Sequence, residues 1–373
     1  MAVQPSTGSM STAASPKPAL TALPDRRGLL VRLGVMVAVL LGLGLAVSSM
    51  PGLDELRRRL ADAAPGWLAV ALALEALSCL AFIAAFRGVF SRRLSWRFSY
   101  EVGMAAQGTN VLLPAGGASG LALGAWALRK AGMSTERLAR RTVAFFLITS
   151  SVNFATAALV GAAVTLGLLA GGGASPALTA VPAALAAGTI AAVHFLPRLL
   201  DRPRSPSGRV TRVLAKGGTA LGAGIRDARA LVRSGSPLVI AGAIGYMALD
   251  LAALAAAFAA VGSPPPLGVL ALAYVIGQLG GLIPLPGGVG GADGGLIAAL
   301  ALYGTPLAPA VAAVLAYRAF QLGLPALLGA LAVIRLPGVL RSVPAMCEPP
   351  AMRTARGALP GAGPVAPMGV AAS

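Results

Sequence analysis

The chain has 373 residues, of which 57% are hydrophobic and 11% charged, and its mean hydropathy is +0.80. Soluble domains carry about 25% charged residues, so this composition excludes a soluble globular protein and predicts a polytopic helical membrane protein. The formal net charge of +18 does not indicate a nucleic-acid-binding protein, because the basic residues lie in short loops beside apolar runs and no stretch interleaves them with aromatic residues.

The two ends of the chain differ in composition from the part between them. Residues 1–24 are rich in Ser, Thr, Pro and Ala, and residues 344–373 in Pro, Gly and Ala, so both are expected to be disordered tails. Residues 25–343 form the expected integral membrane domain. Apolar runs long enough to cross about 30 Å of hydrocarbon predict about six spans, the first an uncleaved signal anchor: 29–48, 67–90, 142–170, 177–196, 237–261 and 307–334.

The loops between these spans fall into two groups by charge. Residues 50–66 place leucines at helical spacing among charged residues and predict a short interfacial helix. The loop at 91–100 is basic, and so is 198–235, with nine Lys or Arg and two Asp, whereas 171–176 and 262–266 carry no charge. Because positive loops stay inside, we expect both termini to be cytoplasmic in a multi-pass protein of the cell (cytoplasmic) membrane.

Two apolar regions are interrupted by proline and glycine. Residues 101–128 break at Pro114–Gly117, and residues 267–303 break at Pro284–Gly288. The arms are about 12 residues long, or about 18 Å as helix, which is too short to cross the membrane. Both regions therefore predict re-entrant broken-helix hairpins, the first entering from the cytoplasm and the second from outside.

The two hairpins belong to an expected internal repeat. A shift of 172 positions places Pro114 on Pro286 and Gly116 on Gly288. The units 67–170 and 237–334 each contain a span, a hairpin and a long span, and they begin on opposite sides of the membrane. The predicted fold is an all-α polytopic membrane protein, with six full spans and two re-entrant hairpins arranged as an inverted repeat.

Broken backbone at membrane depth must find polar partners, so the two hairpins are predicted to line a polar cavity. The helix N-terminus after each break favours an anionic group. Glycine and proline are also simply commoner in membrane helices, and that alternative remains open. The substrate-binding candidates lie at the breaks, in the arms beside them or in the last span: Asn110, Pro114, Gly116, Gly117, Gln278, Pro284, Pro286, Gly287, Gly288, Gly290, Asp293 and Arg318.

Three acids fall inside apolar segments, where ionisable residues are expensive and mark functional sites. Glu75 and Asp250 occupy roughly corresponding places in the two units, and Asp293 lies near the start of the second half-helix. Asp293 is equally suited to stabilising that helix start. Arg318 lies inside the last span, and we expect it to pair with Asp293 or Asp250, or to meet an anionic lipid group.

The stretch LIPLPGGVGGADGGLIAALALYGTPLAPAVAAVLAYRAFQLGLPALLGAL resembles the closing block of a known family, the flippase-like transmembrane region of lysylphosphatidylglycerol synthases. The family pattern is P-x-P-G-G-x-G-x-x-E, a Gly-x-Pro turn and a Tyr-Arg pair. The matching residues are Pro284, Pro286, Gly287, Gly288, Gly290, Asp293, Gly304, Pro306, Tyr317 and Arg318.

The resemblance covers about residues 67–335, with two departures from the family pattern. Asp293 stands where the family has Glu, and in NVLLPAGGASG the pair Ala118-Ser119 stands where many members place an acid and an arginine. In the full-length synthases this region is thought to move an aminoacylated phospholipid between leaflets. The soluble synthase domain has no expected counterpart in residues 344–373.

The resemblance and the hairpins together imply a flippase or transporter for a phospholipid or other amphiphile with an anionic headgroup. A non-catalytic accessory or scaffold protein is the alternative. A membrane enzyme acting on lipid head groups is less favoured, because no span carries paired acids, a nucleophile beside a base or a metal-ligand set. The expected partners are membrane lipids and a separate lipid-modifying enzyme, with no nucleic acid, no metal and no cofactor.

Overall fold

The structure is a computed structural model that describes residues 53–112, 118–200, 209–280 and 291–341, together with Gly28, Val31 and Gly34. Every regular element in the four ranges is an α-helix. The helices are α2 Asp54–Ala61, α3 Pro65–Phe90, α4 Trp96–Leu112, α5 Ala118–Lys130, α6 Thr135–Thr165, α7 Pro176–Leu200, α8 Arg209–Arg233, α9 Pro237–Ala260, α10 Leu267–Gly280, α11 Gly291–Leu302 and α12 Leu307–Arg341. Both predicted tails lie outside the described residues.

Five of the described helices are long and apolar enough to cross a membrane: α3, α6, Pro176–Leu196 of α7, α9 and α12. They confirm a polytopic helical membrane protein and match five of the six predicted spans. The sixth, at 29–48, lies outside the described residues apart from helical Val31 and Gly34. Helix α6 begins seven residues earlier than expected, because Ser134 caps it by accepting from the Arg137 backbone N–H.

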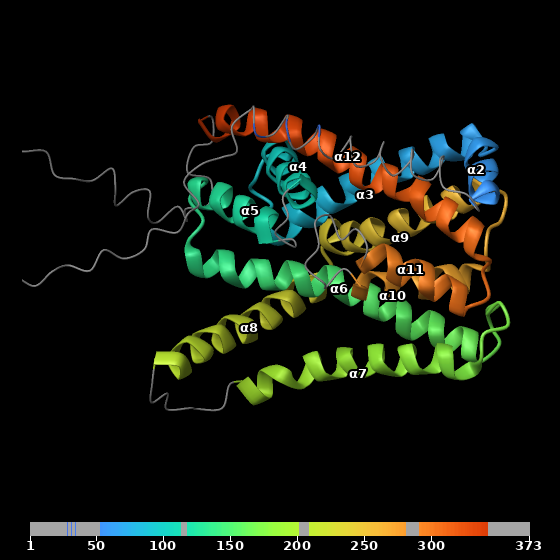
Figure 1. The fold of residues 1–373 in the computed structure, drawn as a ribbon. Helices are drawn as coiled ribbons and strands as arrows, with labels where there is room; N and C mark the ends of the chain where they lie inside the picture. The colour runs from blue at the N-terminus through green and yellow to red at the C-terminus, as the bar shows by residue number, and fades with distance from the viewer. Residues whose placement is uncertain are drawn as a thin grey trace, which may run out of the picture.

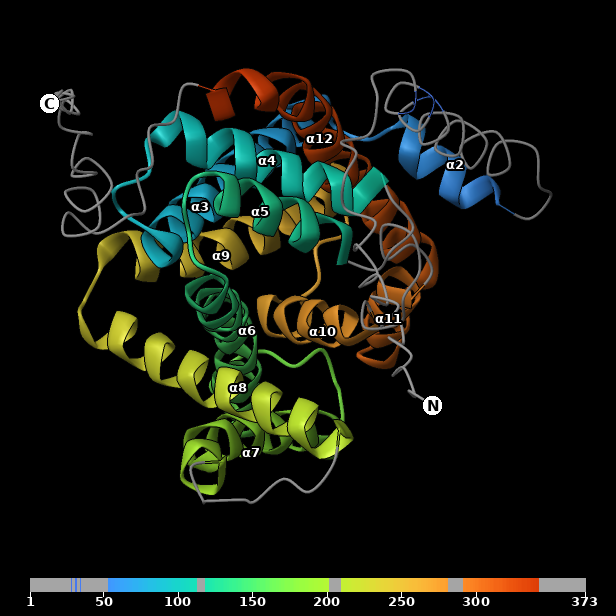
Figure 2. The same ribbon diagram turned by 90° about the vertical axis from the view of Figure 1, so that its left-hand side faces the viewer.

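The segment 198–235, expected as a basic loop, contains the 25-residue helix α8. Its arginines, lysine and alanines are good helix formers, and its apolar residues recur at helical spacing. Ile225 and Ala228 are buried on the side of α8 that packs against α6 and α7. Figure 2 shows α6, α8 and α7 below the group formed by α3, α4, α9 and α12. Among the basic residues of α8 whose side chains are described, Arg226 and Arg233 are exposed, so the charge there belongs to the outer side of a helix.

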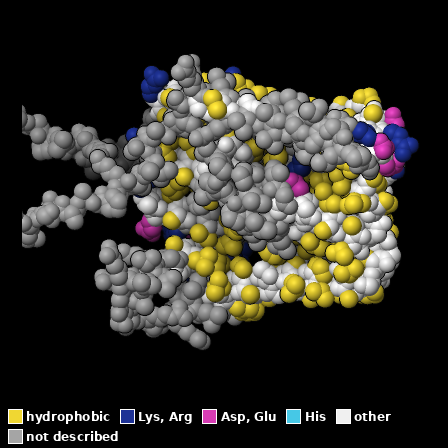
Figure 3. Space-filling model, viewed as in Figure 1, with side chains coloured by type: hydrophobic (Ala, Val, Ile, Leu, Met, Phe, Trp, Pro, Cys, Tyr) yellow, Lys and Arg dark blue, Asp and Glu magenta, His cyan; other side chains and the backbone are white. Residues whose placement is uncertain are grey.

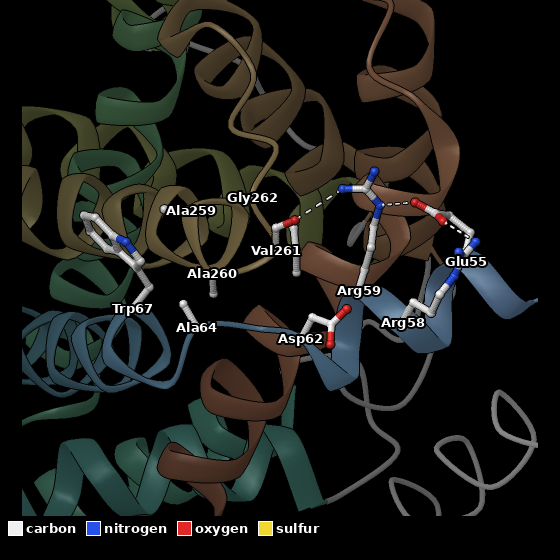
Figure 4. Close-up of a pocket in the computed structure, with 10 residues that line it drawn as sticks. All are labelled: Glu55, Arg58, Arg59, Asp62, Ala64, Trp67, Ala259, Ala260, Val261 and Gly262. Atoms are coloured by element: carbon white, nitrogen blue, oxygen red, sulfur yellow. Dashed lines mark hydrogen bonds and ion pairs between the residues drawn. The ribbon is translucent and has the colours of Figure 1, made fainter.

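Helix α2 confirms the short helix expected within 50–66, and it lies across one end of the molecule (Figure 1). Arg59 Nη1 donates to the Val261 carbonyl at 3.2 Å and to Ser263 Oγ at 2.7 Å, which ties α2 to the end of α9. These elements line a pocket of about 530 Å³, in which Figure 4 shows Arg59 between Glu55 and Val261.

The connecting loops gather at two ends of the molecule. At the α2 end, Tyr303 Oη donates to the Leu178 carbonyl at 2.9 Å, which brings the loop after α11 to the start of α7. At the opposite end, Arg92 donates to Ser236 Oγ, and Arg141 Nη1 donates to the Val89 carbonyl at 3.1 Å. Uncharged loops thus meet at one end and basic loops at the other, as the charge pattern indicates. On the face drawn in Figure 3, hydrophobic side chains occupy much of the described surface between the charged helix α2 and the basic loops at the opposite end.

Small residues bring the helices of the core into close contact. Helices α3 and α9 run antiparallel, with Gly88 beside Val239 at one end of the contact, and a Cβ on Gly242 would lie 2.5 Å from the Ala85 backbone nitrogen. Helices α4 and α12 approach in the same way, because a Cβ on Gly329 would lie 2.5 Å from the Met104 carbonyl oxygen of α4. Such glycine contacts are typical of helix packing in membranes.

The arms of both predicted hairpins are helices that pack side by side, α4 with α5 and α10 with α11. They contain 17, 13, 14 and 12 residues, or about 18 to 25 Å each. The pair α10–α11 starts and ends at the α2 end, where a Cβ on Gly268 would lie 3.0 Å from the Ala170 carbonyl. The pair α4–α5 starts at the opposite end, where the Arg87 guanidinium lies 4.6 Å from the Trp96 ring centre.

Candidate functional site

The first hairpin is held together by side chains next to its break. Asn110 Oδ1, near the end of α4, accepts from the backbone N–H of Gly120 at 2.7 Å. Ser119 Oγ donates back to the Thr109 carbonyl at 3.2 Å. The N-terminus of α5 is therefore capped by the preceding arm, which satisfies backbone groups that a helix start leaves without partners. Asn110, named above as a substrate-binding candidate, thus hydrogen-bonds the backbone beside the break.

The second hairpin places an acid opposite the arginine of α12. Arg318 Nε donates to Asp293 Oδ1, and Arg318 Nη1 donates to Gln321 Oε1. The Arg318 and Asp293 side chains are 12% and 18% exposed. Of the two acids expected as partners of Arg318, the structure thus brings Asp293 into the ion pair. Asp293 lies in the first turn of α11, where the helix dipole also favours a negative charge.

This ion pair lies deep between the two ends of the molecule. Arg318 comes 11 residues after Leu307, the first residue of α12, which is about 16 Å along a helix. Asp293 comes nine residues before Leu302, the last residue of α11, which is about 14 Å. Both residues therefore lie about 15 Å from the α2 end of their helices, beside the break in the second hairpin, and this depth is about half of a ~30 Å hydrocarbon layer.

A second polar cluster surrounds Asp250 of α9. Tyr317 Oη donates to Asp250 Oδ1 at 2.8 Å, and Tyr274 Oη donates to Asp250 Oδ2. All three residues are buried, with 4%, 2% and 5% of Asp250, Tyr317 and Tyr274 exposed. Since Tyr317 precedes Arg318, a single turn of α12 contributes to both polar clusters.

Glu75 of α3 joins the Asp250 cluster. Its side chain is 4% exposed, and its carboxyl group lies within hydrogen-bonding reach of the Asp250 carboxyl. The Cys79 thiol approaches Glu75 Oε1 at 3.8 Å. The sequence indicated that no single span carries paired acids, and the structure forms such a pair from two spans, because α3 and α9 pack against one another.

The other predicted site residues stand as follows. Gln278, near the end of α10, is half-buried. Eight candidates at the two breaks lie outside the described residues: Pro114, Gly116, Gly117, Pro284, Pro286, Gly287, Gly288 and Gly290. In the part of the chain that the structure describes, no group of three or more His, Cys, Asp or Glu side chains is placed to hold a metal ion.

The family model of the lysylphosphatidylglycerol synthase TM region matches residues 31–329 of the chain. The chain belongs to this family. The search of curated proteins found no match to the chain. The matched range includes both hairpins, the Asp293–Arg318 pair, and the Glu75–Asp250 pair. The match confirms the suspected family, and it is consistent with a membrane protein that has a lipid-related role.

Tyr274 and Tyr317 are the partners of Asp250 that the sequence did not reveal as such. In the sequence, Tyr317 is recognisable as part of the family's Tyr-Arg pair, and Tyr274 lies within an apolar run. The chain has five tyrosines in all, so a hydroxyl in the middle of an apolar arm was a usable signal. A buried tyrosine hydroxyl usually finds a hydrogen-bond partner.

Proposed function

We propose that the protein is a flippase or transporter that moves a phospholipid, or another amphiphile with an anionic headgroup, across the cytoplasmic membrane. In this proposal the two broken helix pairs enter the membrane as re-entrant hairpins and line the path of the headgroup. Both termini are cytoplasmic, so the α2 end faces outward. The membership of the lysylphosphatidylglycerol synthase TM region family supports a role with lipids.

The observation that carries the proposal is the Asp293–Arg318 ion pair beside the second break. A charged pair in an apolar core gains less from pairing than it loses by leaving water, so a chain seldom keeps one for stability alone. Arginine binds phosphate as readily as carboxylate. A lipid phosphate that reaches this depth replaces Asp293 as the anionic partner of Arg318, and the N-terminus of α11 adds backbone N–H donors.

The helix contacts support the inverted repeat that this proposal requires. If α3–α6 and α9–α12 are equivalent units, α3 must pack against its counterpart α9, and every other contact must occur twice. The contact of α4 with α12 has a counterpart in that of α10 with α6, and the pair α4–α5 has one in the pair α10–α11. The antiparallel course of α3 and α9 agrees with units of opposite orientation.

A transporter also agrees better than an enzyme with the polar groups present. Asp293 is engaged by Arg318, and Asp250 by two tyrosines. These contacts engage both carboxylates with neighbouring side chains, as expected of groups that bind a substrate. We propose that the protein works on membrane lipids without a catalytic step of its own, and that a separate lipid-modifying enzyme supplies its substrate.

Leaflet-resolved lipid movement tests the proposal. Purified protein is reconstituted into vesicles that contain a headgroup-labelled fluorescent phospholipid, anionic in one set and zwitterionic in another, and a membrane-impermeant quencher reports the label in the outer leaflet. We expect protein-containing vesicles to lose more fluorescence than protein-free vesicles, with a larger effect for the anionic lipid. Equal quenching in both preparations would favour a scaffold, and a chemically altered lipid would favour an enzyme.

A further inference from the structure

Two buried carboxyl groups meet where the two halves of the molecule pack together. Glu75 of α3 and Asp250 of α9 are each 4% exposed. Glu75 comes ten residues after the start of α3, and Asp250 ten residues before the end of α9. Both are therefore about 15 Å from the α2 end. Ser78 Oγ donates to the Tyr246 carbonyl at 2.9 Å, which fixes the register of the helices one turn away.

The hydrogen-bond donors around the pair are unevenly shared. Asp250 accepts from the hydroxyl groups of Tyr274 and Tyr317, one at each carboxylate oxygen. Glu75 Oε1 has the Cys79 thiol at 3.8 Å, a weak donor, and no donor from the described residues reaches the buried Glu75 Oε2. A single negative charge shared by the two acids is therefore better placed on Asp250 than on Glu75.

The charged groups nearby do not neutralise two carboxylates. Arg318 of α12 is close enough to act electrostatically on both acids, but its guanidinium already pairs with Asp293. Among the described residues, the other titratable groups facing the pair are the Tyr246 hydroxyl of α9 and the hydroxyl and thiol groups named above. An unpaired charge is unfavourable in a buried apolar site, and a carboxylate there takes up a proton instead.

Two carboxyl groups within hydrogen-bonding reach can bond only when one of them carries a proton, because a carboxylate is an acceptor only. We propose that Glu75 and Asp250 form a proton-binding site, in which protonated Glu75 donates to the Asp250 carboxylate. Asp250 then accepts hydrogen bonds from Glu75 and from two tyrosines, and the Glu75 oxygen that has no donor carries the proton. The site binds one proton in the core, on the contact between the two halves.

Loss of this proton links the site to the lipid path, a step that rests on the proposed function. Release of H⁺ from Glu75 to water leaves two facing carboxylates, whose repulsion is relieved when a positive charge approaches. Arg318 is that charge, and it follows Tyr317, which already contacts Asp250. The deprotonated Glu75–Asp250 pair therefore competes with Asp293 for the Arg318 guanidinium. A lipid phosphate bound at Arg318 opposes the movement of the guanidinium toward that pair.

Infrared spectroscopy of the full chain in lipid nanodiscs tests the proton site without any measurement of lipid movement. We expect the C=O stretch of a protonated carboxylic acid at neutral pH, lost in Glu75→Gln and lost from wild type at alkaline pH. Glu101→Gln serves as the matched control, because Glu101 is also buried but lies on α4, and it should leave the band that Glu75→Gln removes.

A second variant keeps the test valid if Glu75→Gln fails to fold. Asp250→Asn replaces the acceptor of the Glu75 proton, so the band should remain and shift in frequency. Absence of a carboxylic acid band in folded wild type at neutral pH would overturn the proposal, and so would a band unaffected by both substitutions. A band that behaves as expected in a protein that moves no lipid would leave the proton site intact and refute the proposed function alone.

Discussion

The ion pair between Asp293 and Arg318 predicts an uneven effect of its two single substitutions on stability. Removing one partner of a buried pair typically costs about 3 to 5 kcal/mol, because the other charge is left stranded. The two side chains are 12% and 18% exposed, so we expect the lower part of that range. Asp293→Asn leaves Arg318 with Gln321 as a neutral partner, and we expect it to cost about 3 kcal/mol.

Arg318→Gln should be the milder change. Asp293 then remains charged in the first turn of α11, where the helix dipole contributes about 0.3 to 1 kcal/mol. We therefore expect a loss of about 2 kcal/mol on this basis. The double variant strands neither charge, so it should lose less than the sum of the two, with a coupling of about 1 to 3 kcal/mol.

The free energy of unfolding can be measured by titrating SDS into mixed micelles and following the helical circular dichroism signal. Arg341→Gln is the matched control, because Arg341 is exposed at the end of the same helix, and it should change stability by less than about 0.5 kcal/mol. Strict additivity of the two single substitutions, or a milder effect of Asp293→Asn than of Arg318→Gln, would refute this reasoning.

Three further predictions concern packing, capping and topology. Gly329→Ala should cost about 1 to 3 kcal/mol in the same titration, because its Cβ would lie 2.5 Å from backbone atoms of α4. A Cβ on Gly323 of the same helix has nothing within 4 Å, so Gly323→Ala should be neutral or stabilise by up to about 1 kcal/mol. Equal effects of the two substitutions would contradict the close contact. Asn110→Ala removes the 2.7 Å hydrogen bond that caps α5 and should cost about 1 kcal/mol of unfolding free energy. An unchanged midpoint of the SDS titration would show that the cap contributes nothing. In a cysteine-free background, an impermeant thiol reagent should label exposed Ser175→Cys but not exposed Ser234→Cys in sealed cells, and the reverse pattern would invert the topology.

The sequence was sufficient for most of the helical architecture, because apolar length is a strong local signal. Five expected spans became helices α3, α6, α7, α9 and α12, and the interruptions at Pro114 and Pro286 fall between two short paired arms in each case. Helix α8 could not be predicted, because its many arginines are typical of a solvated loop and its apolar side is buried only by packing against α6 and α7. That information lies in the tertiary contacts.

The site shows the same division between local and tertiary information. Asp293 and Arg318 could be paired from topology, since both lie at similar depth beside one break. The meeting of Glu75 with Asp250 depends on the register of α3 against α9, which small residues such as Gly242 set by close contact. A hydropathy pattern carries no register between helices, so the two acids and the tyrosines of Asp250 could be identified singly but not assembled.

The central claim is that the Asp293–Arg318 site carries lipid, and the double variant Asp293→Asn/Arg318→Gln tests it most directly. Because this variant strands no charge, it should insert and fold, which circular dichroism in nanodiscs can verify. The leaflet-resolved assay should then show movement of the anionic fluorescent phospholipid in wild type and in Arg341→Gln, and movement at the protein-free level in the double variant. Undiminished lipid movement in the folded double variant would contradict the account and reduce the ion pair to a structural contact.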